Sequence, residues 1–172
     1  MDILSLENTG RLYWLGRYSE RVYTTVRLFS GSFDQLIDQV SEDATLIDRF
    51  CRSLEIPNIY RTGEEFFTRY CFDDQDPNSI YANLLRAYDN CVTLREEIGS
   101  ETVAYIQLAL YALQKAGRSS APLVGLQKMC DNILAFWGMV DDSIDSEYVR
   151  NIIKIGKRVE RLDLYGRLRR PA

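Results

Sequence analysis

The stretch LYWLGRYSER at residues 12–21 recurs as IIKIGKRVER at residues 152–161, close to the other end of the chain. Both stretches follow one pattern: an aliphatic residue, two variable residues, a second aliphatic residue, glycine, a basic residue, two variable residues, and then glutamate and arginine. The match continues through Arg27-Leu28 in the first copy and Arg167-Leu168 in the second. This repeat predicts how two distant parts of the chain pack together.

The glycine, the glutamate and the later arginine of each copy fall on one narrow stripe of a helix, at about 100° per residue. The residues on these stripes are Gly16, Glu20 and Arg27, and Gly156, Glu160 and Arg167. A glycine inside a helix costs about 1 kcal/mol relative to alanine, and close approach of two helices is the simplest reason for it. Such helices would bring each glutamate near the arginines of the other copy. We therefore predict that the two helices are neighbours and that both glutamates form charge-assisted hydrogen bonds with arginine.

The composition is that of an ordinary globular domain. The chain has 172 residues, of which 46% are hydrophobic and 27% are charged, and this length corresponds to one domain. No apolar run approaches the roughly 18 residues of a membrane span. The acidic start MDILSLE does not fit a secretory signal. We therefore expect a cytoplasmic protein with no membrane partner.

The sequence contains no histidine. This excludes Ser-His-Asp and Cys-His nucleophilic sites, histidine-ligated zinc, and the Glu-x-x-His iron sites of helical bundles. The cysteines are Cys51, Cys71, Cys91 and Cys130, with no C-x-x-C pair. This spacing fits neither a zinc site nor a redox dithiol, so we expect reduced cysteines that pack as small core residues.

The charge of the chain is unevenly placed. The net charge is −4, but residues 147–172 carry eight basic and three acidic side chains, which leaves −9 on residues 1–146. A basic terminal helix could bind phosphates or an acidic partner. We favour the alternative that it packs against the acidic remainder of its own domain, because nucleic-acid modules are usually far more basic overall.

Apolar residues recur at spacings of three and four almost throughout, and alternating strand patterns are missing. The spacing predicts helices over residues 7–40, 41–56, 62–71, 76–98, 100–116, 122–140 and from residue 146 onward. We expect one all-α domain over residues 1–172, a bundle of six to seven helices whose N- and C-terminal helices pack together.

Capping residues mark several of the expected helix ends. Thr62 begins a capping box, and Asp76 is expected to cap the fourth helix with Pro77 at its first position. Gly99 is expected to end that helix, and Ser100 to cap the next one.

The helix expected over residues 76–98 carries a polar stripe around Arg86. The other residues of this stripe are Ser79, Asn83, Asn90, Thr93 and Glu97. Arg95 lies on the opposite side, among apolar residues that should be buried. Because a buried guanidinium without a carboxylate is very costly, we expect Arg95 to be buried and paired with Glu20 or Glu160.

Three blocks of the sequence resemble the bacterial alpha-E family, an all-helical domain named for its Glu-Arg motif. The blocks are residues 12–21, residues 76–101 and residues 156–161, and together they span most of the chain. We expect no catalytic residue, metal ligand or cofactor. The repeat and the resemblance together give these motif or ligand-binding positions: Gly16, Arg17, Glu20, Arg21, Arg27, Asn78, Ser79, Arg86, Asn90, Arg95, Glu101, Gly156, Glu160, Arg161 and Arg167.

The resemblance also implies partners. Alpha-E proteins are often encoded with, or fused to, ATP-grasp-type amide ligases and transglutaminase-like peptidases, which suggests a role in making or modifying a peptide. Family members usually continue well past the second Glu-Arg motif, so this chain resembles a short form. Apolar surface left exposed in a short form predicts a homodimer.

Several functions remain open at this point. We favour a non-catalytic accessory or scaffold protein that works with such a ligase and a transglutaminase-like protein. The alternative is a helical enzyme that uses carboxylates and Mg²⁺ on a phosphorylated or acidic substrate, because Asp141, Asp142 and Asp145 match the D-D-x-x-D pattern of prenyl-diphosphate enzymes. Acid–base catalysis by Glu20 or Glu160 is a further possibility. Nucleic-acid binding through the basic last helix is the least favoured.

Overall fold

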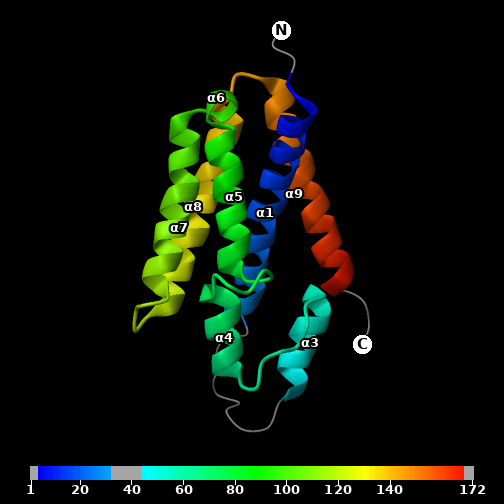
Figure 1. The fold of residues 1–172 in the computed structure, drawn as a ribbon, viewed down its shortest axis with the longest axis vertical. Helices are drawn as coiled ribbons and strands as arrows, with labels where there is room; N and C mark the ends of the chain where they lie inside the picture. Colours follow the sequence, from blue (N-terminus) through cyan, green and yellow to red (C-terminus); the bar gives the residue numbers. More distant parts are fainter. Residues whose placement is uncertain (1–3, 32–43, 169–172) are drawn as a thin grey trace.

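The structure is a computed structural model that describes residues 4–31 and 44–168. This part of the chain contains eight helices and no strand (Figure 1). The helices are α1 (Leu6–Ser30), α3 (Ala44–Leu54), α4 (Gly63–Phe72), α5 (Ile80–Thr93), α6 (Arg95–Ile98), α7 (Ser100–Ala116), α8 (Pro122–Ser143) and α9 (Glu147–Leu168). The all-α fold predicted from the sequence is confirmed. The expected helix start at Ser41, and residues 32–40 of the first expected helix, lie outside the described residues.

Helix α1 lies at the centre of the bundle, between α5 on one side and α9 on the other (Figure 1). Helices α7 and α8 pack against each other and complete the bundle beside α5 and α1, while α3 contacts α9 and α4 contacts α5. The N- and C-terminal helices are therefore neighbours, as predicted. None of the described helices is long and apolar enough to cross a lipid bilayer.

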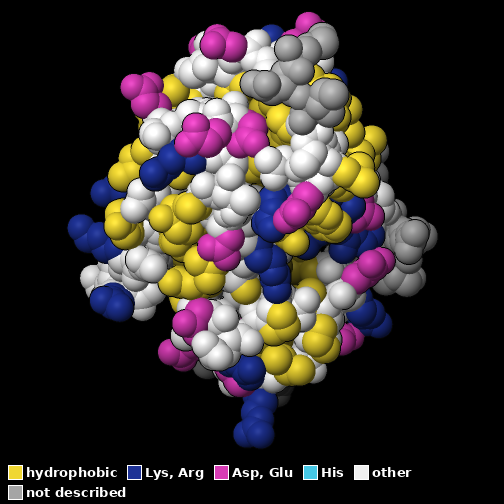
Figure 2. Space-filling model, turned by 45° about the horizontal axis from the view of Figure 1, so that its top comes forward, with side chains coloured by type: hydrophobic (Ala, Val, Ile, Leu, Met, Phe, Trp, Pro, Cys, Tyr) yellow, Lys and Arg dark blue, Asp and Glu magenta, His cyan; other side chains and the backbone are white. Residues whose placement is uncertain are grey.

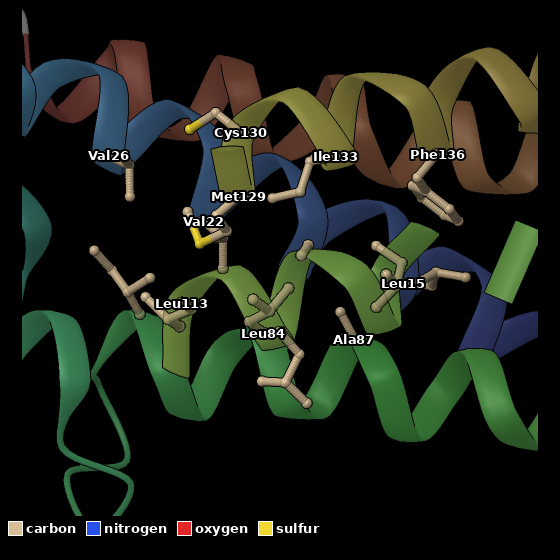
Figure 3. Close-up of a cluster of buried hydrophobic side chains, with 14 of the residues drawn as sticks. Leu15, Val22, Val26, Leu84, Ala87, Leu113, Met129, Cys130, Ile133 and Phe136 are labelled. Carbon is tan, nitrogen blue, oxygen red and sulfur yellow. The ribbon is translucent and has the colours of Figure 1, made fainter. Parts of the chain in front are cut away.

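The main core lies where α1, α5, α7 and α8 meet. The α1 residues that are spaced by three and four from Leu12 to Val26 are buried, namely Leu12, Leu15, Ser19, Val22 and Val26, and side chains from the other three helices close over them (Figure 3). The labelled members of this cluster include Leu15, Val22 and Val26 of α1, Leu84 and Ala87 of α5, Leu113 of α7, and Met129, Ile133 and Phe136 of α8. All four cysteines are free and buried, as predicted.

Several helix ends follow the sequence closely. The backbone N–H of Glu65 donates to Thr62 Oγ1 at 3.1 Å, and the Glu65 carboxylate accepts from the backbone N–H of Arg61 at 2.8 Å, so Thr62 caps α4 as expected. Helix α7 has the predicted bounds, and Gly99 precedes it with a φ of 83°, a conformation that favours glycine. Gly99 itself, rather than Ser100, is the N-terminal cap of α7.

The start of α5 differs from the prediction by one turn. Ser79 is its N-terminal cap and accepts a hydrogen bond from the backbone N–H of Ala82 at 3.0 Å. Asp76 instead closes the preceding turn by accepting from the backbone N–H of Asn78 at 2.9 Å, and it also accepts from the hydroxyl of Tyr60 at 3.0 Å. A contact with a distant tyrosine therefore holds the favoured capping residue outside the helix.

The expected helix over residues 76–98 is divided at Leu94, so the described residues contain one helix more than the seven expected. Leu94 leaves the helical conformation, with φ of −93° and ψ of 14°, and its side chain is fully buried. The turn rotates Arg95 to the surface, where it is exposed. The prediction that Arg95 is buried and paired with Glu20 or Glu160 is therefore wrong. It assumed a continuous helix over residues 76–98, whereas the helix is interrupted at Leu94 and the side chains after it point in other directions.

One further helix end differs from the prediction, and another falls where an interruption was expected. The sequence predicts a bend or interruption at Gly31 in the helix over residues 7–40, and helix α1 ends at Ser30 with Gly31 in a turn. Helix α8 continues to Ser143, so Asp141 and Asp142 are helical rather than part of an acidic turn.

Candidate functional site

The two repeat copies contact each other at their glycines, where the backbones of α1 and α9 come together. A Cβ atom on Gly16 would lie 2.1 Å from the carbonyl oxygen of Ile153, and one on Gly156 would lie 2.0 Å from the carbonyl oxygen of Tyr13. Both distances are far shorter than real contacts allow. Helices α1 and α9 can approach this closely only because both positions are glycine, as the repeat predicted.

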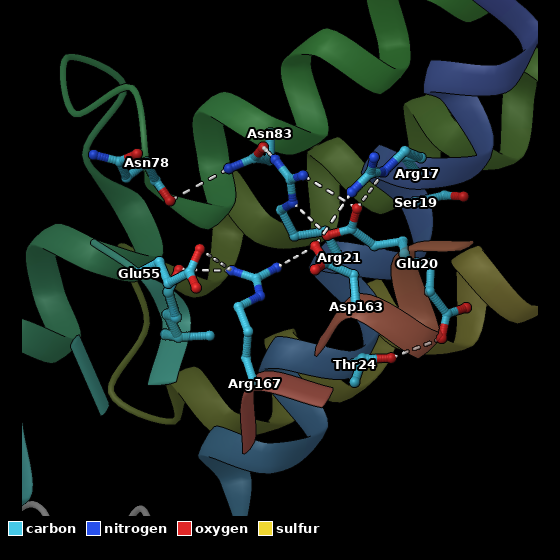
Figure 4. A network of polar contacts seen from close by, with 12 residues as sticks. Arg17, Ser19, Glu20, Arg21, Thr24, Glu55, Asn78, Asn83, Asp163 and Arg167 are labelled. Atoms are coloured by element: carbon cyan, nitrogen blue, oxygen red, sulfur yellow. Dashed lines mark hydrogen bonds and ion pairs between the residues drawn. The ribbon is translucent and has the colours of Figure 1, made fainter. Parts of the chain in front are cut away.

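Glu20 of α1 is completely buried and is held by the second repeat copy. Arg161 of α9 donates through Nε to Glu20 Oε1 at 2.7 Å and through Nη2 to Oε2 at 3.1 Å. The hydroxyl of Thr24 donates to Oε1 at 2.8 Å (Figure 4). The hydrogen bond to Glu20 raises the pKa of Arg161.

Glu160 of α9 is also completely buried and is held by the first copy. Arg17 Nε donates to Glu160 Oε2 at 2.6 Å, and Arg21 donates through Nε to Oε1 at 2.7 Å and through Nη2 to Oε2 at 3.1 Å. Burial works against the charge of Arg17, but the hydrogen bond and negative charge of Glu160 prevail and raise its pKa. Each glutamate thus takes its arginines from the opposite helix, which confirms the predicted pairing.

The network continues from α1 into the start of α5 (Figure 4). Arg21 Nη1 donates to Asn83 Oδ1 at 3.2 Å, and the Asn83 amide donates to the carbonyl oxygen of Ser79 at 2.8 Å. Arg86 donates to the carbonyl oxygen of Pro77 at 2.8 Å and to Asn83 Oδ1 at 3.4 Å. The polar stripe predicted on this helix therefore contacts the first repeat copy through Asn83.

A second extension runs along α9 toward α3. Asp163 Oδ2 accepts from Arg17 at 3.3 Å and from Arg167 at 2.8 Å, and Arg167 also donates to the carbonyl oxygen of Leu54 at 3.0 Å (Figure 4). The charges of the two repeat copies thus tie four helices together: α1, α3, α5 and α9.

The structure brings most of the predicted motif residues into this network. Those in direct contact with a buried glutamate, or at the glycine contact, are Gly16, Arg17, Glu20, Arg21, Gly156, Glu160 and Arg161. Those in its extensions are Asn78, Ser79, Arg86 and Arg167. Asn90 accepts from Arg11 at 3.4 Å, away from the glutamates. Arg27, Arg95 and Glu101 are exposed and take no part in the network.

Sequence reasoning missed a polar cluster on the buried side of the α1–α9 contact. Trp137 of α8 donates through its ring N–H to the hydroxyl of Ser19 at 3.1 Å, and the Lys157 ammonium lies 3.4 Å from the centre of the Trp137 ring. Burial lowers the pKa of Lys157, and the charge of Glu20 opposes this. The available signal was Ser19, a polar residue on the apolar face of α1.

The aspartates that suggested Mg²⁺ do not form a metal-binding cluster. Within residues 4–31 and 44–168, no three acidic or cysteine side chains are placed to hold one metal ion. Asp141 and Asp142 are exposed near the end of α8, Asp145 follows in the turn, and Asp141 pairs with Lys154 at 2.5 Å. The geometry gives no support to a D-D-x-x-D metal site.

The basic last helix is paired internally rather than presented as a uniform cationic surface. Lys154 pairs with Asp141 and Arg161 pairs with Glu20, so the segment packs against its own domain, as favoured from the sequence. Figure 2 shows a face on which basic, acidic and hydrophobic side chains are interspersed. Such a mixed surface does not favour binding to a nucleic-acid backbone.

A groove lies between α1 and α5, on the outer side of α1. Its volume is about 460 Å³, and its walls combine aromatic, basic, acidic and amide side chains. The residues that line it are Glu7, Gly10, Arg11, Trp14, Tyr18, Arg86, Asp89 and Asn90.

The comparisons with known proteins agree with the repeat and with the helical fold. The Alpha-E family model, described as "a predicted alpha-helical domain with a conserved ER motif", matches residues 8–170. No curated protein and no solved structure matches the chain. The Glu-Arg pairs of the repeat, Glu20-Arg21 and Glu160-Arg161, are the residues that cross-link α1 and α9.

Proposed function

Because the chain belongs to the Alpha-E family, we propose that it is a non-catalytic helical accessory protein. Its partners are an ATP-grasp-type amide ligase and a transglutaminase-like protein, in the synthesis or modification of a peptide. The resemblance supports the identity of these partners, and the geometry of the repeat supports the non-catalytic role.

The observation that carries the proposal is that arginines bind both oxygens of each buried carboxylate. Every oxygen of Glu20 and Glu160 accepts a hydrogen bond from an arginine, and neither residue is exposed at all. A general acid or base has to come within hydrogen-bonding distance of a substrate atom. Both carboxylates are closed off from solvent and bound by arginines of the opposite helix, so the Glu-Arg motif acts as a brace between α1 and α9.

A brace of this kind suits a protein that presents a fixed surface. Arg17 and Arg21 hold Glu160 on one side, and they also lie against the rings of Trp14 and Tyr18 on the outer side of α1. The buried network therefore fixes the aromatic side chains that a partner would meet. Preformed surfaces bind with a smaller loss of conformational entropy.

Direct measurement with a purified ligase tests this function. The ligase would be the ATP-grasp-type amide ligase encoded by a neighbouring gene, with binding followed by calorimetry and amide formation by ADP release. We expect a saturable complex and a rise of about tenfold in ligase rate at limiting peptide concentration. The accessory protein alone should release no ADP and cleave no peptide.

Variants of exposed and buried acids provide the controls. Glu64→Gln changes an exposed residue of α4 that belongs to no proposed site and should leave complex formation unchanged. Absence of any complex with the ligase, or peptide turnover by the isolated protein that is lost in Glu160→Gln without unfolding, would contradict the proposal.

A further inference from the structure

The groove between α1 and α5 contains a glycine that the packing of the protein does not require. Gly10 lies in the second turn of α1, and a Cβ atom there would meet no other atom within 4 Å. By contrast, Gly16 and Gly156 are needed for the contact with α9. Gly138 and Gly166 are helical glycines with equally open surroundings, but of these three only Gly10 lines the groove. Its missing side chain keeps the groove open.

The aromatic wall of the groove is held in one arrangement. Trp14 is 41% exposed and stacks on Tyr18, with ring centres 5.4 Å apart and planes at 28°. The guanidinium of Arg17 lies over the Trp14 ring at 5.2 Å, and Arg17 is itself fixed by Glu160. The part of the indole that Tyr18 and Arg17 leave exposed is the position that an aromatic ring of a ligand would contact.

The charges in the groove select for a single carboxylate. Arg86 donates only to the neutral oxygens of Pro77 and Asn83, and it forms no ion pair in the described part of the chain. Arg11, in contrast, pairs with Glu7 at 2.8 Å. Arg86 is therefore the groove cation that lacks a counter-ion, and a guanidinium binds a carboxylate strongly. Asp89 and Glu7, which also line the groove, would repel a chain of phosphates.

We propose that the α1–α5 groove binds a short peptide segment in which an acidic residue lies next to an aromatic residue. The carboxylate pairs with Arg86, and the aromatic ring stacks on Trp14. The segment passes over Gly10, where a side chain would block it. This inference rests on the proposed function only for the view that the protein binds rather than transforms peptides, and it can be tested without the ligase.

The probes are two capped tetrapeptides, Gly-Glu-Phe-Gly and Gly-Phe-Glu-Gly, and their glutamine counterparts. Binding is followed by calorimetry and by tryptophan fluorescence, since the peptides contain no tryptophan and, of the two tryptophans of the protein, Trp14 lines the groove whereas Trp137 is buried on α8 outside it. We expect at least one acidic peptide to bind saturably, and its glutamine counterpart to bind about tenfold more weakly. If neither acidic peptide binds at millimolar concentration, or if the glutamine forms bind equally well, the inference is overturned.

Matched glycine substitutions separate binding from folding. Gly10→Met should abolish peptide binding with the thermal unfolding temperature unchanged or raised, because the new side chain enters open space and methionine favours helix. Gly138→Met is the control, since Gly138 is also an exposed helical glycine with no atom within 4 Å, and it lies outside the groove. It should leave peptide binding intact, and equal loss in both variants would overturn the assignment.

Substitution of Arg86 and competition by phosphate ligands are the remaining tests of the groove. Arg86→Gln should weaken the acidic peptide about tenfold and leave the glutamine peptide unaffected. Tripolyphosphate and an oligonucleotide should not compete, and competition that Gly10→Met removes would reassign the groove to phosphate ligands. If the protein binds the peptide but forms no complex with the ligase, this inference stands and the proposed partnership is contradicted. If it binds the ligase but no peptide, the partnership stands and this inference is overturned.

Discussion

The carboxylates of Glu20 and Glu160 differ in how well their arginines can return to water. Arg161, the partner of Glu20, is 46% exposed, whereas Arg17 and Arg21, the partners of Glu160, are 17% and 30% exposed. Removing one member of a buried pair leaves the other as an uncompensated charge, at a cost of about 3–5 kcal/mol. The cost should therefore depend on which glutamate is changed.

We expect Glu160→Gln to lower the free energy of unfolding by about 3 kcal/mol or more, and Glu20→Gln to lower it by less. In the first variant two partly buried guanidinium groups lose Glu160, and only Arg17 keeps another carboxylate, Asp163, whereas in the second Arg161 can turn toward solvent. Urea unfolding of both variants measures the difference. Equal losses, or a larger loss for Glu20→Gln, would show that exposure of the arginines does not set the cost.

The glycine contact gives a second prediction at the scale of single residues. Gly16→Ala should lower the free energy of unfolding by about 3 kcal/mol, because the added Cβ would meet the backbone of α9, which cannot turn away as a flexible side chain can. Gly138→Ala, in open space on α8, should instead raise it by about 0.5–1 kcal/mol through helix propensity. Thermal unfolding of both variants tests the prediction, and a neutral Gly16→Ala would contradict the close contact.

At the scale of the helices, the repeat predicted more of the packing than the individual helix ends did. Gly16, Glu20 and their counterparts on α9 predicted both the partner helix and the bonds, because a mid-helix glycine and a buried charge each need a specific neighbour. Asp76 and Ser79 are both good capping residues, so local propensity could not decide between them. The contact between Asp76 and Tyr60 decided it, and that contact depends on the tertiary fold.

The break in the helix at Leu94 predicts different effects for substitutions at Leu94 and at Arg95. Leu94→Ala should lower the free energy of unfolding by about 2–5 kcal/mol because it removes a fully buried side chain. Arg95→Ala should change it by less than about 0.5 kcal/mol because the side chain is exposed. Chemical denaturation gives both values. The opposite order would return Arg95 to the buried side of an unbroken helix.

At the scale of the whole molecule, the homodimer expected from the sequence stays a prediction. Helix α9 exposes Tyr148, Ile155 and Leu162, seven residues apart and 53%, 50% and 74% exposed, a spacing typical of helix pairs. An antiparallel second copy of α9 would bring Glu147 near the basic second half of the helix. We expect sedimentation to give a dimer that Leu162→Glu dissociates and Leu108→Glu, on α7, does not. A monomer at high protein concentration would contradict this.

The four buried thiols couple the stability of the whole fold to alkaline pH. Burial raises the pKa of Cys51 to about 11 and that of Cys130 to about 12, and it raises the pKa values of Cys71 and Cys91 further. Between the ordinary thiol pKa and these raised values, the unfolded chain releases protons that the folded chain retains. The stability contributed by the protonated thiols is therefore present below about pH 8.5 and is lost as the pH rises above it.

Two measurements check this coupling. At about pH 8 the native thiols should react with a disulfide reagent only as fast as the protein opens, whereas the urea-unfolded chain should react at once. The free energy of unfolding should fall between about pH 8.5 and pH 11, and Cys51→Ala should fall less steeply, because one of the titrating groups is gone. Fast reaction of the folded protein would show that the cysteines are accessible, and an unchanged slope in the variant would assign the alkaline loss to other groups. Since Cys71, Cys91 and Cys130 each lie on a different helix of the bundle, equal and slow reaction of all of them would show that α4, α5 and α8 open together rather than one at a time.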